Sequence, residues 1–310
     1  MTDPTVKPEL EDSAFQLSLR GAQLDCRPGA NVAHVAGILN VTPDSFYDGG
    51  MFLDYGVALR RAEQIMAEGA VMIDVGGASS RPRGTAYGTG ATVVSPDEEW
   101  GRVGPIIKGI VRELPEAIVS VDTFHDGVAR KALDAGAHLI NDITALRVSP
   151  GIADVVAAAG AGLILMHSVG EPGAMPHEHE YDDVVLEVSS TLAEACQVAR
   201  AAGVKALVVD PGFGFGKKRR DNMRLIAETA SFLQLGSPVM VGVSRKSSIG
   251  AAVGGTLDST ETTVPPSDRL FGSLGATAIG VMEGATLVRT HDVRETVEML
   301  RVMAAVVERR

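Results

Sequence analysis

Polar and charged side chains recur in this chain directly after short apolar runs. Eight such runs occur, at residues 35–39, 71–75, 118–121, 139–140, 163–166, 207–209, 239–243 and 285–288. The groups that follow them are Asn40, Ser79-Ser80-Arg81, Asp122, Asn141-Asp142, His167, Asp210, Ser244-Arg245-Lys246, and Arg289 with His291. If the runs are parallel strands, these groups meet at the carboxyl edge of the sheet. In barrels of alternating strands and helices, that edge is where the active site lies.

Three carboxylates stand among these groups and indicate a ligand that donates hydrogen bonds. Asp122 lies in Ser-Val-Asp-Thr, Asp142 in Ile-Asn-Asp-Ile, and Asp210 ends a very apolar run. With Asn141 they match the N–C–N edge of an amino-pyrimidine, because a carboxylate accepts two parallel N–H groups in bidentate geometry. A single buried aspartate can equally be structural, but the convergence of several favours a heterocyclic ligand.

Cations follow the last two apolar runs and indicate an anionic substrate. Loops after the seventh and eighth strands of (β/α)8 barrels often bind phosphate, and here they carry Ser244, Arg245 and Lys246, then Arg289 and His291. The chain as a whole has a net charge of −11 and a pI near 5.1. We therefore expect a basic mouth on an acidic protein, formed by Arg81, Lys217, Lys218, Arg245, Lys246 and Arg289.

The segment Asp210-Pro-Gly-Phe-Gly-Phe-Gly-Lys217 combines glycines with aromatic rings. Its glycines permit positive φ and a close approach of the backbone to a ligand, and Phe213 and Phe215 offer flat faces to a planar ring. A purely structural turn is the alternative. The sequence holds no zinc-type Cys-x-x-Cys spacing, and we interpret His177-Glu-His179 as surface rather than as a metal site.

The elements that must position these groups alternate regularly along the chain. Amphipathic stretches with helical spacing lie at 55–68, 97–113, 127–135, 151–159, 181–202, 219–233, 268–283 and 293–309. Eight strands alternating with eight helices predict a (β/α)8 TIM barrel formed by residues 13–310 as a single domain. Residues 15–26 alternate around a glycine and predict a hairpin that plugs the barrel bottom. We expect residues 1–12 to be a disordered tail, and long loops at 40–54, 79–96 and 248–267 on the catalytic side.

The overall composition narrows the class of protein. The hydrophobic content of 45% in 310 residues is ample for a large core, and the negative net charge argues against nucleic-acid or anionic-membrane binding. The two cysteines, Cys26 and Cys196, lie far apart and favour a reducing compartment. The polar, acidic N-terminus is unlike a signal peptide and no run is long enough to span a membrane, so we expect a cytoplasmic protein.

Six motifs together resemble those of the dihydropteroate synthase family. They lie at 37–50, 120–123, 140–143, 210–217, 244–250 and 289–293, in the family's order, within a resemblance that runs from about residue 15 to 307. The resemblance implies a pterin-binding TIM barrel of the folate pathway. Such an enzyme is a transferase that condenses 6-hydroxymethyl-7,8-dihydropterin diphosphate with 4-aminobenzoate by SN1-like displacement of pyrophosphate. It also implies Mg²⁺ as cofactor, a homodimer and a sulfonamide target.

The resemblance also assigns site residues, with Asp122, Asp210, Lys246 and Arg289 as the catalytic group. The implied pterin pocket contains Asp122, Asn141, Asp210, Gly214, Phe215 and Lys246. The implied pyrophosphate site contains Asn40, Arg81, Arg289 and His291, with Mg²⁺ at Asn40. The implied 4-aminobenzoate pocket contains Ser80, Pro82, Phe213 and Ser244.

The chain departs from the family pattern mainly on the aminobenzoate side. Ala78 stands where the family often has Glu, Ser80 where it usually has Thr, and residues 83–92 lengthen the loop. Two alternatives are a pterin-binding methyltransferase-like barrel and a non-catalytic paralogue. The first would not need the anion-binding groups, and the second would be expected to have lost some of them.

Overall fold

The computed structural model describes residues 12–29, 33–41, 55–78, 94–176, 178–259 and 264–307. Within these ranges eight parallel strands form one ring, in the order β8-β7-β6-β5-β4-β3-β10-β9. A parallel bridge between Val209 and Val239 joins its two ends. The strands are β3 (His34–Asn40), β4 (Met72–Gly76), β5 (Ile118–Asp122), β6 (Leu139–Asp142), β7 (Gly162–Met166), β8 (Ala206–Asp210), β9 (Met240–Val241) and β10 (Leu287–Thr290).

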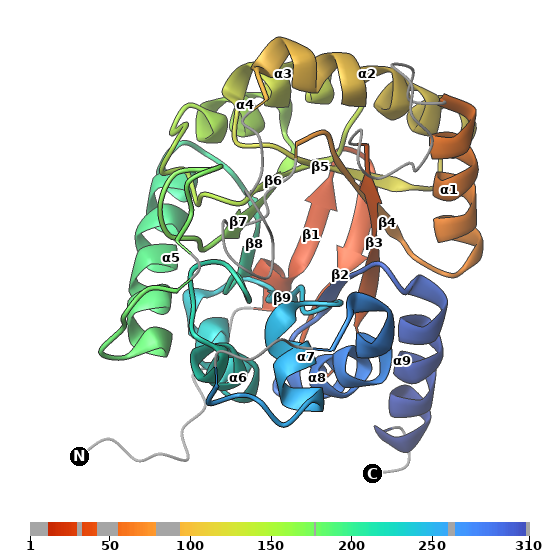
Figure 1. The fold of residues 1–310 in the computed structure, drawn as a ribbon. Helices are drawn as coiled ribbons and strands as arrows, with labels where there is room; N and C mark the ends of the chain where they lie inside the picture. The colour runs from red at the N-terminus through yellow and green to blue at the C-terminus, as the bar shows by residue number, and fades with distance from the viewer. Residues whose placement is uncertain are drawn as a thin grey trace.

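Helices follow the strands and surround the ring, as Figure 1 shows. They are α1 (Tyr55–Ala67), α2 (Pro96–Glu113), α3 (Asp126–Asp134), α4 (Ile152–Ala159), α5 (Val184–Ala201), α6 (Arg219–Ala227), α7 (Ser247–Val253), α8 (Leu270–Met282) and α9 (Val293–Val307). The 3₁₀ segments are η1 (Asp12–Phe15), η3 (Thr229–Leu235) and η4 (Pro266–Arg269). This arrangement confirms the predicted TIM barrel.

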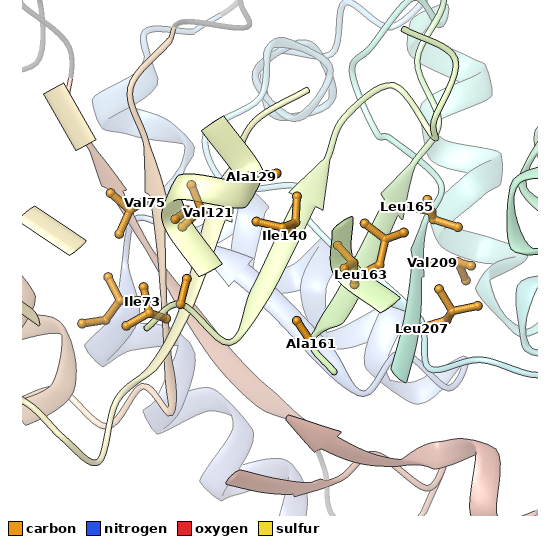
Figure 2. Packing of buried hydrophobic residues seen from close by; sticks show 14 of the residues in the cluster. Ile73, Val75, Val121, Ala129, Ile140, Ala161, Leu163, Leu165, Leu207 and Val209 are labelled. Carbon is orange, nitrogen blue, oxygen red and sulfur yellow. The ribbon is translucent and has the colours of Figure 1, made fainter. Parts of the chain in front are cut away.

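The strands divide their side chains between two faces because successive residues of a strand point in opposite directions. Outward residues such as Ile73, Val121 and Leu163 pack against the helices in one large buried cluster, part of which appears in Figure 2. The alternate residues face the barrel interior. Near the strand starts these interior residues are apolar, and toward the strand ends they become polar or charged, so one end of the barrel holds the core and the other the site.

The hairpin of β1 (Gln16–Leu19) and β2 (Ala22–Asp25) closes the apolar end, which confirms the predicted plug. Leu17, Leu19 and Leu24 pack onto the interior residues at the strand starts, and the hairpin lies across the middle of the ring in Figure 1. Gly162 makes room for this contact, since a Cβ there would lie 2.6 Å from Leu19 Cδ2. Arg20 then fastens the turn by donating to two backbone carbonyls of the α3 region, each at 2.6 Å.

The structure differs from the sequence prediction in one loop and one helix. Most of α7 and part of η4 lie in the segment 248–267, which the sequence predicts to be a loop. The prediction missed α7 because this helix is too short to show a helical period in the sequence. The predicted 219–233 helix ends at Ala227 and continues as η3. Residues 1–11, 42–54 and 79–93 lie outside the described residues, and with them nearly all of the expected tail and most of two predicted long loops. Among the described helices, none is long and apolar enough to cross a membrane.

Candidate active site

Three predicted residues, Asn40, Asp122 and Asn141, lie side by side with Gly76 because the register of neighbouring strands places them on one level. Asn40 pairs with Gly76, Gly76 with Asp122, and Asp122 with Asn141, across β3, β4, β5 and β6. Gly76 has no side chain, so the space between Asn40 and Asp122 is left unfilled. A Cβ on Gly76 would lie 3.6 Å from Asn40 Oδ1 and 3.7 Å from Asp122 Oδ2.

These strand ends surround a small cavity at the carboxyl end of the barrel. One part of its lining is polar, and the other is apolar and partly aromatic. The lining residues are Asp122, Asn141, Asp210, Lys246, Arg289, Ile143, Met166, Phe213, Phe215 and Gly242. A flat ring with a hydrogen-bonding edge fits such a mixed lining, because apolar walls bury the faces while a few polar groups fix the orientation.

Arg289 links the carboxylates inside the barrel. Its Nε donates to Asp74 Oδ2 at 2.6 Å and its Nη2 to Asp122 Oδ2 at 3.2 Å. Asn141 Nδ2 also donates to Asp74 Oδ2, at 3.2 Å. Asp74 therefore fixes the orientation of both Arg289 and Asn141, and its side chain is almost completely buried.

The sequence interpretation missed Asp74 and overrated Asp142. Asp74 lies inside an apolar run rather than at its end, but it is two residues before Gly76 and so shares its face, a signal that could have identified it. Asp142 follows the inward-facing Asn141 and must therefore point away from the cavity. Its carboxylate accepts from the backbone of Thr144 and Leu146, at 2.8 and 2.7 Å, so its role is structural.

The opposite wall holds Asp210 and Lys246. Asp210 Oδ1 accepts from the backbone N–H of Gly212 at 2.7 Å, while a Cβ on Gly242 would lie 3.7 Å from Asp210 Oδ2. The Lys246 ammonium lies 3.9 Å from the centroid of the Phe215 ring, a cation–π contact. Gly214 allows this packing, since a Cβ there would meet Lys246 Cδ at 3.1 Å.

Burial changes the acid–base behaviour of these groups. It raises the pKa of Asp122 to about 7, although the nearby Arg289 favours the charged form. It likewise raises the pKa of Asp210, which the Gly212 N–H and Lys246 oppose. Burial lowers the pKa of Lys246 to about 8. These directions follow because burial disfavours whichever form carries charge.

The loops after β9 and β10 are joined at the predicted anion site. The Ser244 hydroxyl accepts from the backbone N–H of His291 at 3.2 Å and lies 3.1 Å from its ring Nδ1. Arg245 is a positive-φ residue whose guanidinium pairs with Asp292, with Nε 3.0 Å from Oδ2. Burial lowers the pKa of His291 to about 3, so at neutral pH it can offer an N–H but no positive charge.

The basic mouth is smaller than the sequence predicts. Lys217 is buried beneath the glycine-rich loop, Lys218 pairs with Glu180, and Arg245 pairs with Asp292. Among the described residues of the predicted mouth, only Lys246 and Arg289 line the cavity. Ser80, Arg81 and Pro82 lie outside the described residues, so their predicted roles stay predictions.

The side chains of Asn40 and Asp122, which lie on either side of Gly76, suit the Mg²⁺ ion that the family resemblance implies. Mg²⁺ prefers hard oxygen ligands and usually keeps several waters, binding through one or two protein groups and substrate phosphates. Asn40 Oδ1 and Asp122 Oδ2 are such oxygens, both beside Gly76. No cluster of three or more His, Cys, Asp or Glu able to hold a metal occurs in the described part of the chain. The two oxygens of Asn40 and Asp122 suit an ion that takes its other ligands from water and from a phosphate.

Comparisons with known proteins agree with this geometry. A family model described as "Pterin binding enzyme" matches residues 36–291. The chain is 42% identical over 293 residues to the dihydropteroate synthase of Escherichia coli (strain K12), covering 94% of this chain and 96% of that protein. It is also similar to two solved structures of Xanthomonas albilineans dihydropteroate synthase, each with 40% identity, 94% of this chain and 98% of that chain covered. The structure with 4-aminobenzoic acid has a TM-score of 0.82 and the complex with 7,8-dihydropteroate one of 0.77.

Proposed function

Because this chain belongs to the dihydropteroate synthase family of pterin-binding enzymes, we propose that its barrel-mouth cavity condenses 6-hydroxymethyl-7,8-dihydropterin diphosphate with 4-aminobenzoate. The products are 7,8-dihydropteroate and pyrophosphate. The observation that carries this proposal is the lining of one cavity by Asp122, Asn141, Asp210 and Lys246 together with Phe215. These groups can accept the N–H edge of a pterin and cover its ring face.

The reaction needs charge stabilisation more than proton transfer. The bond between the exocyclic carbon and the diphosphate oxygen breaks, and the amine nitrogen of 4-aminobenzoate forms the new bond and then loses a proton. Positive charge that develops on the pterin is stabilised by the carboxylates of Asp122 and Asp210, which are already held in place. Preorganised charges of this kind are often the largest contribution to catalysis.

The leaving pyrophosphate is assigned to the side of the cavity that carries Arg289. Arg289 supplies positive charge, and His291 supplies a neutral N–H from the adjacent loop. We assign Mg²⁺ to Asn40, where a bound ion would neutralise charge on the diphosphate. Arg81 is proposed as a further anion ligand, and Ser80, Pro82, Phe213 and Ser244 as contacts to 4-aminobenzoate, on the family resemblance alone.

The direct test is to incubate the protein with the pterin diphosphate, 4-aminobenzoate and Mg²⁺. We expect pyrophosphate and 7,8-dihydropteroate to appear in equal amounts, and omission of 4-aminobenzoate to abolish the second product. A methyltransferase-like barrel or a non-catalytic paralogue would bind a pterin without releasing pyrophosphate. Pterin binding with no pyrophosphate would therefore reject the synthase assignment while retaining the pterin site.

We also propose that two copies of the chain associate through α8. Phe271 and Met282 on this helix are 84% and 74% exposed, and Ile279 is half exposed. Phe271, Gly275 and Ile279 recur every four residues, so they share one face, and nothing lies within 4 Å of a Cβ built on Gly275. A second copy can place its own Phe271 in that notch, as a two-fold interface requires. Phe271→Glu should yield monomers in sedimentation, and an unchanged mass would reject this interface.

A further inference from the structure

Lys217 is a buried amine that the proposed reaction does not use, and burial lowers its pKa to about 7. We propose that Lys217 is a positioning residue, whose ammonium group holds the glycine-rich loop 211–217 in the shape that lines the pterin cavity. The part of this inference that concerns pterin binding rests on the proposed function, whereas the part that concerns the loop does not.

The ammonium group lies at the centre of the loop. Lys217 Nζ donates to the backbone carbonyls of Gly212 and Phe215, at 2.9 and 3.1 Å. It also lies 3.0 Å from His167 Nδ1 and 3.4 Å from the His167 carbonyl, in the segment that follows β7. The side chain therefore joins the two ends of the Gly212–Phe215 turn to a neighbouring strand end.

A lysine suits this arrangement of acceptors better than an arginine. An ammonium group presents three N–H donors from one atom, whereas a guanidinium spreads its donors in a planar fork. Among the described residues no salt bridge involves Lys217, although the carboxylates of Asp210 and Asp221 are near enough to favour its charged form. Burying a cation is costly unless hydrogen bonds satisfy it, and here carbonyls and a ring nitrogen do so.

The loop that Lys217 holds has a backbone shape that its glycines permit but do not fix by themselves. Gly212, Gly214 and Gly216 all have positive φ. A Cβ on Gly212 would lie 1.8 Å from the His167 carbonyl oxygen, so the backbone passes directly over the segment to which Lys217 is bonded. Asn222 supports the loop from outside, because its Oδ1 accepts from the Gly214 N–H at 2.6 Å.

The consequence for the cavity follows from what the loop carries. Phe213 and Phe215 both line the cavity, and the Phe215 ring lies against the Lys246 ammonium. The carbonyl of Phe215 is one of the groups that Lys217 holds. Loss of the Lys217 donors should therefore displace the Phe215 ring from its place beside Lys246, although Lys217 itself does not line the cavity.

The test compares Lys217→Met with Arg20→Met, because Arg20 also holds backbone carbonyls through a cation but at the opposite end of the barrel. Hydrogen–deuterium exchange reports the loop, and calorimetric titration with the pterin diphosphate reports the cavity. For Lys217→Met we expect exchange at Gly214 and Phe215 to accelerate at least tenfold and the pterin Kd to rise at least tenfold. For Arg20→Met we expect faster exchange in the hairpin and an unchanged Kd.

Three results would overturn the proposal. These are unchanged exchange in the loop of Lys217→Met, faster loop exchange with an unchanged pterin Kd, and equal losses of affinity in both variants. If Lys217→Met does not fold, Lys217→Gln, which retains two N–H donors, serves for the same two measurements. Failure of the wild-type protein to bind the pterin would instead reject the proposed function, and the exchange data would still decide whether Lys217 holds the loop.

Discussion

The two ends of the barrel are built from the same strands but differ in what their interior residues do. At the closed end, Met72, Ile118 and Leu139 pack against the hairpin. At the open end, Asp122 and Asn141, from β5 and β6, surround a cavity with Arg289. Only two to four residues separate the two sets along each strand. Stability and chemistry are therefore separated along the barrel axis rather than assigned to different strands.

This difference indicates how substitutions should behave at each end. Residues of the closed end bury apolar area, so their loss should lower the free energy of unfolding and leave kinetics unchanged. Residues of the open end are charged and desolvated, so their loss should reduce activity while costing little stability or even raising it. Arg289 is the exception, because it pairs with carboxylates inside the barrel.

The largest effect is expected for Arg289→Ala. This substitution lies at the open end but should reduce both stability and activity. The change leaves Asp74 and Asp122 without their cation, and an unpaired buried charge typically costs about 3–5 kcal/mol. Chemical denaturation should show this loss of unfolding free energy, and steady-state assays should show loss of turnover. Arg289→Lys is the control, and it should recover part of the stability. Undiminished stability of the alanine variant would mean that the carboxylates do not depend on Arg289.

Asp122→Asn should follow the open-end behaviour. The amide keeps the size of the side chain but removes the negative charge that stabilises the pterin, so kcat should fall by about 10²–10³. Unfolding free energy should remain within about 1 kcal/mol of wild type, because the change also removes a buried charge. Turnover within a few-fold of wild type would show that Asp122 has no catalytic role.

Leu19→Ala should show the opposite behaviour at the closed end. Leu19 is fully buried over Gly162, and truncation of a buried leucine costs about 2–5 kcal/mol. We expect a lower denaturation midpoint with kcat/KM unchanged at a temperature where the variant is folded. A change in kcat/KM equal to that in stability would show that the plug influences the site.

The smallest expected effect is the pH dependence of pterin affinity, which tests the charge states of the open-end residues. Asp122 must be ionised to accept N–H groups, and burial raises its pKa to about 7. Pterin affinity should therefore fall about tenfold for each pH unit below 7. Burial lowers the pKa of Lys246 to about 8, so affinity should also decline above that pH. Titrations at several pH values would show this bell, and Asp122→Asn should weaken its acidic limb, of which Asp210 retains part because burial raises its pKa as well.

The sequence predicts this architecture well because the signals are local and repeated. The runs that end in Asn40, Asp122 and Asp210 correspond to β3, β5 and β8 within one residue at each end. It is harder to predict which polar residue faces the cavity, because neighbouring residues of a strand point to opposite faces and a shift of one residue reverses the assignment. Asn141 faces inward and Asp142 outward, and no composition rule separates them until the strand register is known.

The remaining misses are long-range contacts. Asp74 gains its role from Arg289, 215 residues later in the chain. Lys217 looks like a surface cation in the sequence, and its burial depends on carbonyls of a loop that only the fold brings together. Such roles follow from three-dimensional proximity, which no periodicity or spacing rule reports.

The pairing of β10 with β3, in which Leu287 lies beside His34, has a consequence for how the chain is made. At about 5–20 residues per second, a ribosome needs roughly 12–50 s to synthesise the roughly 250 residues that separate these strands. The hairpin emerges first, but the ring of strand starts that it covers is complete only after the final strand has left the ribosome. During this interval, apolar edges that are later buried are available to other nascent chains. Protection of the nascent barrel should therefore matter most just before β10 appears.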